Sequence, residues 1–110
     1  MHEIKAIIQP FMLDKVLDSL RQVENMPGVA VSEVRVLSRT RMAAENGEPA
    51  TEHLKMTKIE TVVSDALLEI VLRTIQEHAH TGNPLDGKIF VYQVNDVIRI
   101  RTGERGEAAI

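Results

Sequence analysis

The sequence predicts an α+β sandwich in which a strand–helix–strand unit occurs twice. Short β-branched runs alternate along the chain with stretches of helical apolar spacing. Only 3% of the residues are aromatic, so the core must consist of Ile, Val, Leu, Met and Ala. With 110 residues, 44% of them hydrophobic, we expect one domain, residues 1–110. This element order is typical of a split βαβ, or ferredoxin-like, βαββαβ fold.

The first unit occupies residues 4–39. Residues 4–8 are short, apolar and β-branched, which predicts a strand. A helix that ends before Pro27 follows, because four apolar residues have the spacing i, i+3, i+4, i+7: Leu13, Val16, Leu17 and Leu20. Residues 29–39 predict the second strand, whose alternation slips near Glu33 as it would at a β-bulge.

The second unit occupies residues 58–94. Residues 58–63 predict a strand, and Ser64 is the expected N-cap of a helix whose apolar stripe is Leu67, Leu68, Val71, Leu72 and Ile75. A turn over residues 83–87 leads to a strand over 88–94, and an extra C-terminal strand is expected over 97–101. So many Ile and Val residues in strands predict that self-association covers the open face of the sheet.

Residues 40–57 separate the two units and fit neither period. They include Gly47, Pro49 and charges of both signs. Irregular segments longer than about 12–15 residues are uncommon in compact domains and are usually functional or disordered. The alternative interpretation is a solvated hairpin excursion.

Charge and composition exclude several function classes. A net charge of −3 gives no general attraction for duplex DNA or an anionic membrane, and the scarcity of aromatics excludes a base-stacking platform. The absence of cysteine excludes disulfide scaffolds and thiol catalysis. No signal peptide or long apolar run is visible, so we expect a soluble, cytoplasmic protein without nucleic-acid partners or membrane insertion.

The expected C-terminal strand carries the strongest chemical signal. Because side chains alternate with period two, Arg99 and Arg101 are expected to share one face, about 7 Å apart. Two guanidiniums at that distance repel each other unless an anion lies between them, and a phosphate suits their bidentate geometry. The alternative is a pair of surface arginines that form salt bridges with carboxylates.

The turn before residue 88 matches the P-loop spacing GxxxxGK from Gly82 to Lys88. We reject a Walker site, because Ile89 stands where magnesium requires Ser or Thr and because a helix precedes the turn instead of following it. Gly82 and Gly87 still permit unusual backbone conformations. Successive amides beside Lys88 are therefore expected to bind a phosphate.

Other constellations are weak. The four histidines do not converge, so no metal site is expected from His2, His53, His78 and His80. Lys58 and Glu60 share one strand face, which favours an ion pair over a catalytic dyad. Nothing in the residues predicts an enzyme.

Several segments closely resemble the PII signalling protein family, and the similarity covers essentially the whole chain. The resemblance rests on residues 6–11, 13–16, 86–91, 97–104 and 108–110. It implies a ferredoxin-like subunit, a homotrimer with its sheets facing inward, and adenine nucleotides bound in the clefts between subunits. It also implies that residues 40–57 are the mobile T-loop, through which such proteins bind transporters and enzymes.

By position, the resemblance implies a nucleotide site shared between two subunits. Asp86, Gly87 and Lys88 would form the phosphate-binding loop. Arg99 and Arg101 would reach the phosphates from the adjacent subunit. The remaining implied contacts are Arg39 at the phosphates, and Gly28, Val29, Glu60 and Val62 near the adenine and ribose.

The chain also departs from the family pattern. Thr40 stands where the family has a glutamine that helps to hold magnesium, and Met56 stands where a lysine binds 2-oxoglutarate. Leu85 replaces the first glycine of the family's Gly-Asp-Gly-Lys loop. Residues 40–57 contain no tyrosine, so tyrosine uridylylation there is excluded.

These departures predict a divergent PII-like signal-transduction protein, not an enzyme. We expect it to favour ADP or AMP over Mg-ATP, to lack a 2-oxoglutarate response and to regulate a transporter or metabolic enzyme through T-loop ordering. Bicarbonate is the hypothesised co-effector, held at the T-loop by Thr40, Arg41, Lys55 and Lys58. The alternatives are a conventional nitrogen-regulatory PII protein, a CutA-like trimeric metal-tolerance protein and a slow ATPase.

Overall fold

The computed structural model describes residues 1–43 and 49–110, and of residues 38–43 and 49–52 it describes only the backbone. The described residues form four strands, two α-helices and two short 3-10 helices. In chain order these are β1 (His2–Ile8), η1 (Pro10–Met12), α1 (Leu13–Leu20), β2 (Ala30–Ala43), β3 (Pro49–Val63), α2 (Asp65–Ala79), β4 (Gly87–Gln93) and η2 (Gly106–Ala109).

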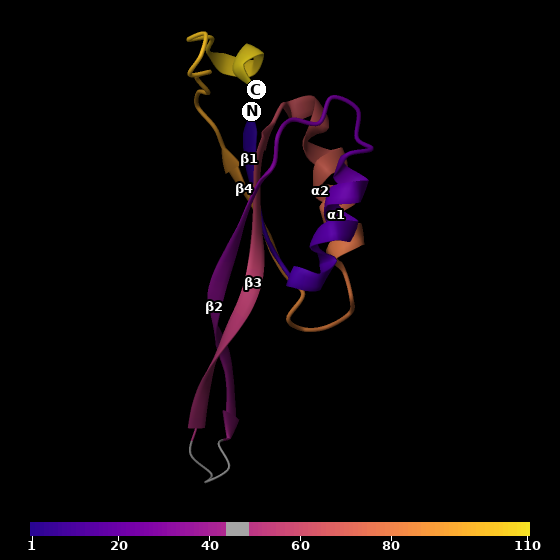
Figure 1. The fold of residues 1–110 in the computed structure, drawn as a ribbon, viewed down its shortest axis with the longest axis vertical. Helices are drawn as coiled ribbons and strands as arrows, with labels where there is room; N and C mark the ends of the chain where they lie inside the picture. Colours follow the sequence, from indigo (N-terminus) through magenta and orange to yellow (C-terminus); the bar gives the residue numbers. More distant parts are fainter. Residues whose placement is uncertain (44–48) are drawn as a thin grey trace.

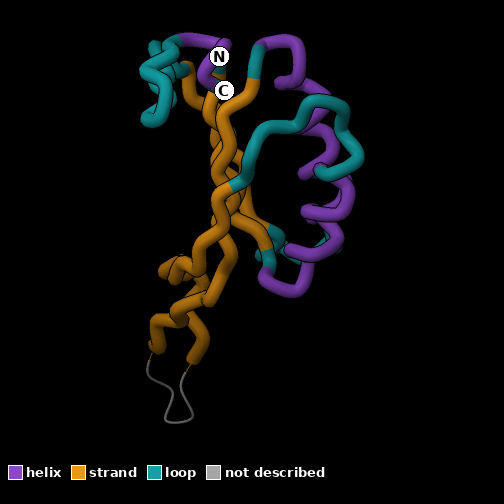
Figure 2. Tube along the Cα trace, turned by 45° about the horizontal axis from the view of Figure 1, so that its top comes forward, coloured by secondary structure: helices purple, strands orange, loops and turns teal. Residues whose placement is uncertain are grey.

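The four strands form one antiparallel sheet in the order β2-β3-β1-β4. Both α-helices lie on the same face of this sheet, and none of the described elements covers the other face (Figures 1 and 2). The predicted α+β, ferredoxin-like fold is thereby confirmed. No helix of the described residues is long and apolar enough to cross a membrane.

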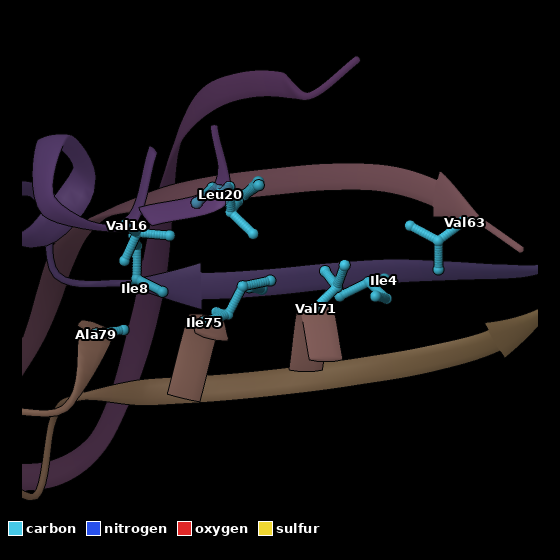
Figure 3. Close-up of a cluster of buried hydrophobic side chains, with 10 residues drawn as sticks. Ile4, Ile8, Val16, Leu20, Val63, Val71, Ile75 and Ala79 are labelled. Atoms are coloured by element: carbon cyan, nitrogen blue, oxygen red, sulfur yellow. The ribbon is translucent and has the colours of Figure 1, made fainter. Parts of the chain in front are cut away.

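The core lies between the helices and the central strand β1. Three alternate residues of β1 point toward the helices and are buried: Ile4, Ala6 and Ile8. The predicted helix stripes meet them through Val16, Leu20, Val71 and Ile75, with Ile59 and Val63 from β3 completing the cluster (Figure 3). Burying each of these larger side chains contributes about 1.5–3 kcal/mol, so this layer holds the strands in register.

The structure corrects the expected boundaries of the middle strands. The segment expected as a loop over 40–57 is strand up to Ala43 and again from Pro49, because β2 and β3 pair with each other from Ala30↔Glu60 to Ala43↔Pro49. The register irregularity lies after Leu37 and not near Glu33. Cross-strand pairing of this kind leaves no hydrophobic period in the sequence, which is why the pattern predicted a loop.

The expected strand over residues 97–101 is absent. Ile98 forms only an isolated bridge with Arg105, and a turn begins at Ile100. The backbone closes on itself instead, since the amide of Arg99 donates to the Glu104 carbonyl at 2.9 Å and the amide of Gly103 donates to the Arg99 carbonyl at 2.8 Å. The period-two argument therefore does not apply to Arg99 and Arg101.

Candidate anion-binding site

Gly87 opens β4 at a very close approach to β1. Its φ is +102°, and a Cβ at this position would lie 1.7 Å from the carbonyl oxygen of Ile7. Only glycine fits there, because the left-handed backbone and the missing space both exclude a side chain. The contact places the next residue, Lys88, directly opposite Ile7 on the neighbouring strand.

Asp86 organises the loop that leads into Gly87. Its carboxylate accepts hydrogen bonds from the amide of Thr81 at 2.8 Å, the amide of Gly82 at 3.0 Å and the Thr81 hydroxyl. These bonds, that of the Thr81 hydroxyl first, hold the pKa of Asp86 below its ordinary value. Asp86 is thus turned toward its own loop and fixes the backbone that precedes Lys88.

Four backbone amides in the loop that precedes Gly87 already donate hydrogen bonds within that loop. Besides the amides of Thr81 and Gly82, the amide of Leu85 donates to Asn83 Oδ1 at 2.8 Å and that of Asp86 donates to the Asn83 carbonyl at 3.0 Å. In this loop the exposed ammonium of Lys88 is therefore the group best placed to meet an anion.

Gln9 supports the same loop, and sequence reasoning missed it. Its side-chain nitrogen donates to the carbonyl oxygen of Leu85 at 3.0 Å. The bond ties the loop to the end of β1, although 76 residues separate the partners in the chain. No local pattern signals such a contact, because it depends on how the strands assemble.

Two cavities adjoin Lys88. One, of about 400 Å³, lies between α2 and the sheet and is bordered by Ile75, Ala79, His80 and Asp86. The other, of about 470 Å³, lies on the uncovered face at the base of the β2–β3 hairpin, lined by Ile7, Val36, Leu54, Met56, Leu85 and Phe90. An apolar recess beside an ammonium suits a ligand that joins a flat apolar group to an anionic one.

The uncovered face also carries the predicted Lys58–Glu60 ion pair. Lys58 Nζ lies 3.2 Å from Glu60 Oε1, and this hydrogen bond holds the pKa of Glu60 below its ordinary value. On the same face the ammonium of Lys5 lies 5.5 Å from the ring centroid of Phe90 and 5.0 Å from that of Tyr92. Lys58 is thus already engaged by a carboxylate.

Gly28 and Val29 lie near the strand segment that carries Glu60 and Val62. Ala30 pairs with Glu60 in the β2–β3 ladder, so the two residues before Ala30 lie beside the C-terminal end of β3. The Thr61 hydroxyl fixes them by donating to the carbonyl oxygen of Gly28 at 2.9 Å. This end of the sheet is also the one where β4 ends, because His2 pairs with both Val63 and Gln93.

Arg99 and Arg101 lie beyond that same end of β4, on an exposed loop. Lys88 lies at the other end of the strand, near the loop that follows α2 (Figure 1). Five strand steps from Lys88 to Gln93 span about 17 Å before the chain even leaves the sheet. One chain therefore presents two separate sets of residues, Asp86–Lys88 at one end and the arginines with Glu60 and Val62 toward the other.

A family model described as nitrogen regulatory protein P-II matches residues 1–104. This chain belongs to the PII family. A nitrogen regulatory protein P-II of Rhodospirillum rubrum is 43% identical over 113 residues, and one of Pasteurella multocida is 45% identical, each match covering 100% of both chains. A crystal structure of Arabidopsis thaliana PII bound to citrate has a TM-score of 0.78 and 38% identity, covering 99% of this chain and 91% of that chain.

Membership of the PII family places the chain among regulatory signalling proteins and not in a CutA-like family. Within the residues that the structure describes, no three His, Cys, Asp or Glu side chains cluster as metal ligands would. The Arabidopsis thaliana PII protein in that crystal structure is bound to citrate.

Three residues that sequence reasoning assigned to ligand binding have side chains outside the described residues. They are Arg39, expected at the phosphates, and Thr40 and Arg41, expected at the T-loop. Their backbone belongs to β2 at the irregularity in the ladder. Between the pairs Leu37↔His53 and Arg41↔Thr51, β2 advances four residues while β3 advances two. Irregularities of this kind often lie beside functional sites, because they change the direction in which side chains point.

Proposed function

We propose that this PII protein is a trimeric signal transducer that binds adenine nucleotides between its subunits. Lys88 of one subunit would contact the phosphates, with Arg99 and Arg101 reaching them from the next subunit. Arg39 would join them at the phosphates, and Glu60, Val62, Gly28 and Val29 would border the adenine and ribose. Nucleotide binding would order residues 40–57 and so change the surface offered to a transporter or metabolic enzyme.

One observation carries this proposal: Lys88 lies at the start of β4, whereas Arg99 and Arg101 lie beyond its other end. A single chain cannot gather Lys88 and Arg101 around one phosphate group. Copies arranged head to tail in a closed ring can do so, because each copy supplies its lysine to one neighbour and its arginines to the other. The uncovered sheet face, with Phe90 and Tyr92 40% and 43% exposed, supports such self-association.

The apolar recess beside Lys88 supports a nucleotide as the ligand. Met56, where the family has a lysine for 2-oxoglutarate, is 4% exposed and lines this recess. At position 56 a dicarboxylate would find a thioether instead of a cation, which supports the proposed loss of the 2-oxoglutarate response. The proposed preference for ADP or AMP over Mg-ATP rests on Thr40, which stands where the family has a glutamine.

Bicarbonate is the co-effector that we propose for this site. The cationic residues proposed to hold it are Arg41, Lys55 and Lys58 of the β2–β3 hairpin, which the ladder places opposite Thr51, Arg35 and Ser32, and Thr40 precedes Arg41 in the chain. Lys58 is paired with Glu60 at 3.2 Å, and Lys55 lies 3.7 Å from Glu33. Bicarbonate must therefore compete with these carboxylates for Lys55 and Lys58, and the side chain of Arg41 lies outside the described residues.

Titration calorimetry on the nucleotide-free protein tests the proposal. ADP, AMP and Mg-ATP are each titrated alone, with bicarbonate and with 2-oxoglutarate. We expect micromolar binding of ADP or AMP that bicarbonate tightens and 2-oxoglutarate leaves unchanged. Unchanged ADP affinity in bicarbonate would remove that co-effector, and absence of any nucleotide binding would overturn the proposal.

Nitrogen sensing is the second candidate function. It is favoured by the 43% identity to proteins named nitrogen regulatory protein P-II, over the whole length of both chains. Its signature in the same experiment is Mg-ATP binding that 2-oxoglutarate tightens. That outcome would mean that other groups of this chain take over the roles of the family's glutamine and lysine, where Thr40 and Met56 stand here.

A further inference from the structure

Residues 97–106, which we call the arginine loop, carry Arg99 and the turn that contains Arg101. The loop extends from the end of β4 beside the N-terminus (Figure 1). Its apolar side chains are not buried within the subunit, since Ile98 is 56% exposed and Ile100 is 100% exposed. The shape of the loop therefore depends on its own hydrogen bonds and not on core packing.

The Asp96 carboxylate contacts both ends of this loop, beside the backbone bond in which the amide of Gly106 donates to the Val97 carbonyl at 2.9 Å. Asp96 Oδ1 accepts hydrogen bonds from the amide of Val97 at 2.9 Å and from the amide of Gly106 at 3.1 Å. Asp96 Oδ2 accepts from Arg105 Nε at 2.8 Å and from Arg105 Nη2 at 2.5 Å. The start and the end of the loop are thus fixed to one side chain just outside it.

We propose that Asp96 and Arg105 form a latch that presents Arg99 and Arg101 to an anionic ligand held by a neighbouring copy. The inference rests on the proposed nucleotide site. Asp96 and Arg105 are positioning residues in it, since they hold the loop while the two arginines touch the ligand. Neither residue stood out in the sequence, because the carboxylate and the guanidinium are nine residues apart.

Two physical reasons make the latch matter for binding. A loop that is already closed loses little conformational freedom when ligand binds, whereas an open one must be ordered at the expense of affinity. Arg105 also satisfies the Asp96 carboxylate with two charge-assisted hydrogen bonds. With that carboxylate engaged, it does not compete with the ligand for Arg99 and Arg101.

Three variants separate the parts of the latch. Asp96→Ala removes all four hydrogen bonds, and we expect it to weaken ADP binding about tenfold, as the loss of charge-assisted bonds that order a loop would. Asp96→Asn keeps an oxygen for the two amides but loses the charge. Arg105→Lys keeps the charge but loses the bidentate geometry. We expect both to weaken binding by a smaller factor than Asp96→Ala does.

A matched control comes from another exposed Asp–Arg pair. Arg21 Nη1 lies 2.5 Å from Asp18 Oδ1 on α1, on the helical layer of the fold. Asp18→Asn removes this pair without touching the arginine loop. We expect it to bind ADP as the unmodified protein does.

The full-length protein and its variants are compared by ADP calorimetry, by light scattering for assembly and by amide hydrogen exchange. The proposal expects weaker ADP binding, unchanged assembly and faster exchange at Arg99, Gly103 and Gly106 in Asp96→Ala. It further expects that Asp96→Ala has no additional effect on affinity once Arg99 and Arg101 are both alanine. A direct ligand contact by Asp96 would instead give an additive effect.

Unchanged ADP affinity in all three latch variants would overturn the latch while leaving the nucleotide site intact. Weaker binding without faster loop exchange would also overturn it. If Asp96→Ala does not assemble, Asp96→Asn and Arg105→Lys decide by the same criteria. If the unmodified protein binds no ADP, AMP or ATP, the proposed function fails, and the latch as a device for ligand binding fails with it.

Discussion

Gly87 and Ile7 meet so closely that a Cβ on Gly87 would lie 1.7 Å from the carbonyl oxygen of Ile7. Gly87 is the first residue of β4, and its partner in the ladder is Ile8, the residue after Ile7. It also sets the position of Lys88, the cation nearest the two cavities. One steric relationship thus supports both the sheet and the candidate site.

Gly87→Ala should destabilise the protein strongly. The new methyl group would overlap backbone atoms of β1, which cannot move without breaking the ladder, so we expect a loss of about 3–4 kcal/mol in unfolding free energy. Gly82→Ala is the matched control, because Gly82 also has a positive φ, +85°, but has open space around it. That change should cost about 1 kcal/mol. Urea unfolding at equal subunit concentration measures both, and equal losses would contradict the steric argument.

Stability of the loop before β4 should depend on the ionisation of Asp86. Its pKa is lowered in the folded protein by the hydrogen bonds of Thr81 and Gly82, so its contribution is fully present above the ordinary pKa of an aspartate. The contribution is lost as pH falls through the lowered, folded-state pKa. The protection factors of the Thr81 and Gly82 amides, which compare exchange with that of an unfolded chain at the same pH, should therefore fall at acidic pH. In Asp86→Asn they should be low at neutral pH as well, and unchanged protection in that variant would refute the role.

Lys88→Ala and Arg101→Ala should each weaken ADP binding by roughly 1.5–3 kcal/mol, the range for a lost hydrogen bond to a charged group. Both side chains are exposed, so neither change should disturb folding. Calorimetry measures the affinity and light scattering measures the assembly. Normal ADP binding by either variant would show that the site lies elsewhere.

Mixing the two defective variants tests whether one site uses two subunits. Subunits of Lys88→Ala still supply the arginine, and subunits of Arg101→Ala still supply the lysine. After co-refolding at equal amounts, about a quarter of the interfaces in a ring would combine both intact groups, since each half is intact with a probability of about one half. Tight ADP binding should reappear at that fraction of sites. Its complete absence, with mixed assemblies demonstrated, would contradict a shared site.

Sequence reasoning was most reliable where the residues themselves impose a period or a backbone geometry. The stripe around Val16 and Leu20 defined α1, and that around Val71 and Ile75 defined α2, because a helix buries one face whatever its neighbours are. The Lys58–Glu60 pair was found in the same way, since residues two apart on a strand share a face. The sequence also indicated that Gly87 permits unusual backbone conformations, but it did not show the close approach to the Ile7 carbonyl that requires glycine there.

Tertiary structure alone decided the rest, because the deciding partners are distant in the chain or lie in another strand. The reach of β2 and β3 follows from their mutual pairing, and the closed loop around Arg99 follows from hydrogen bonds to Glu104 and Asp96 instead of a neighbouring strand. The Asp86 carboxylate accepts hydrogen bonds from the amides of Thr81 and Gly82, in the loop where the glycine pattern had predicted phosphate binding. The sequence by itself determined which groups are available, and the fold determined which of them are already satisfied and which remain to bind a ligand.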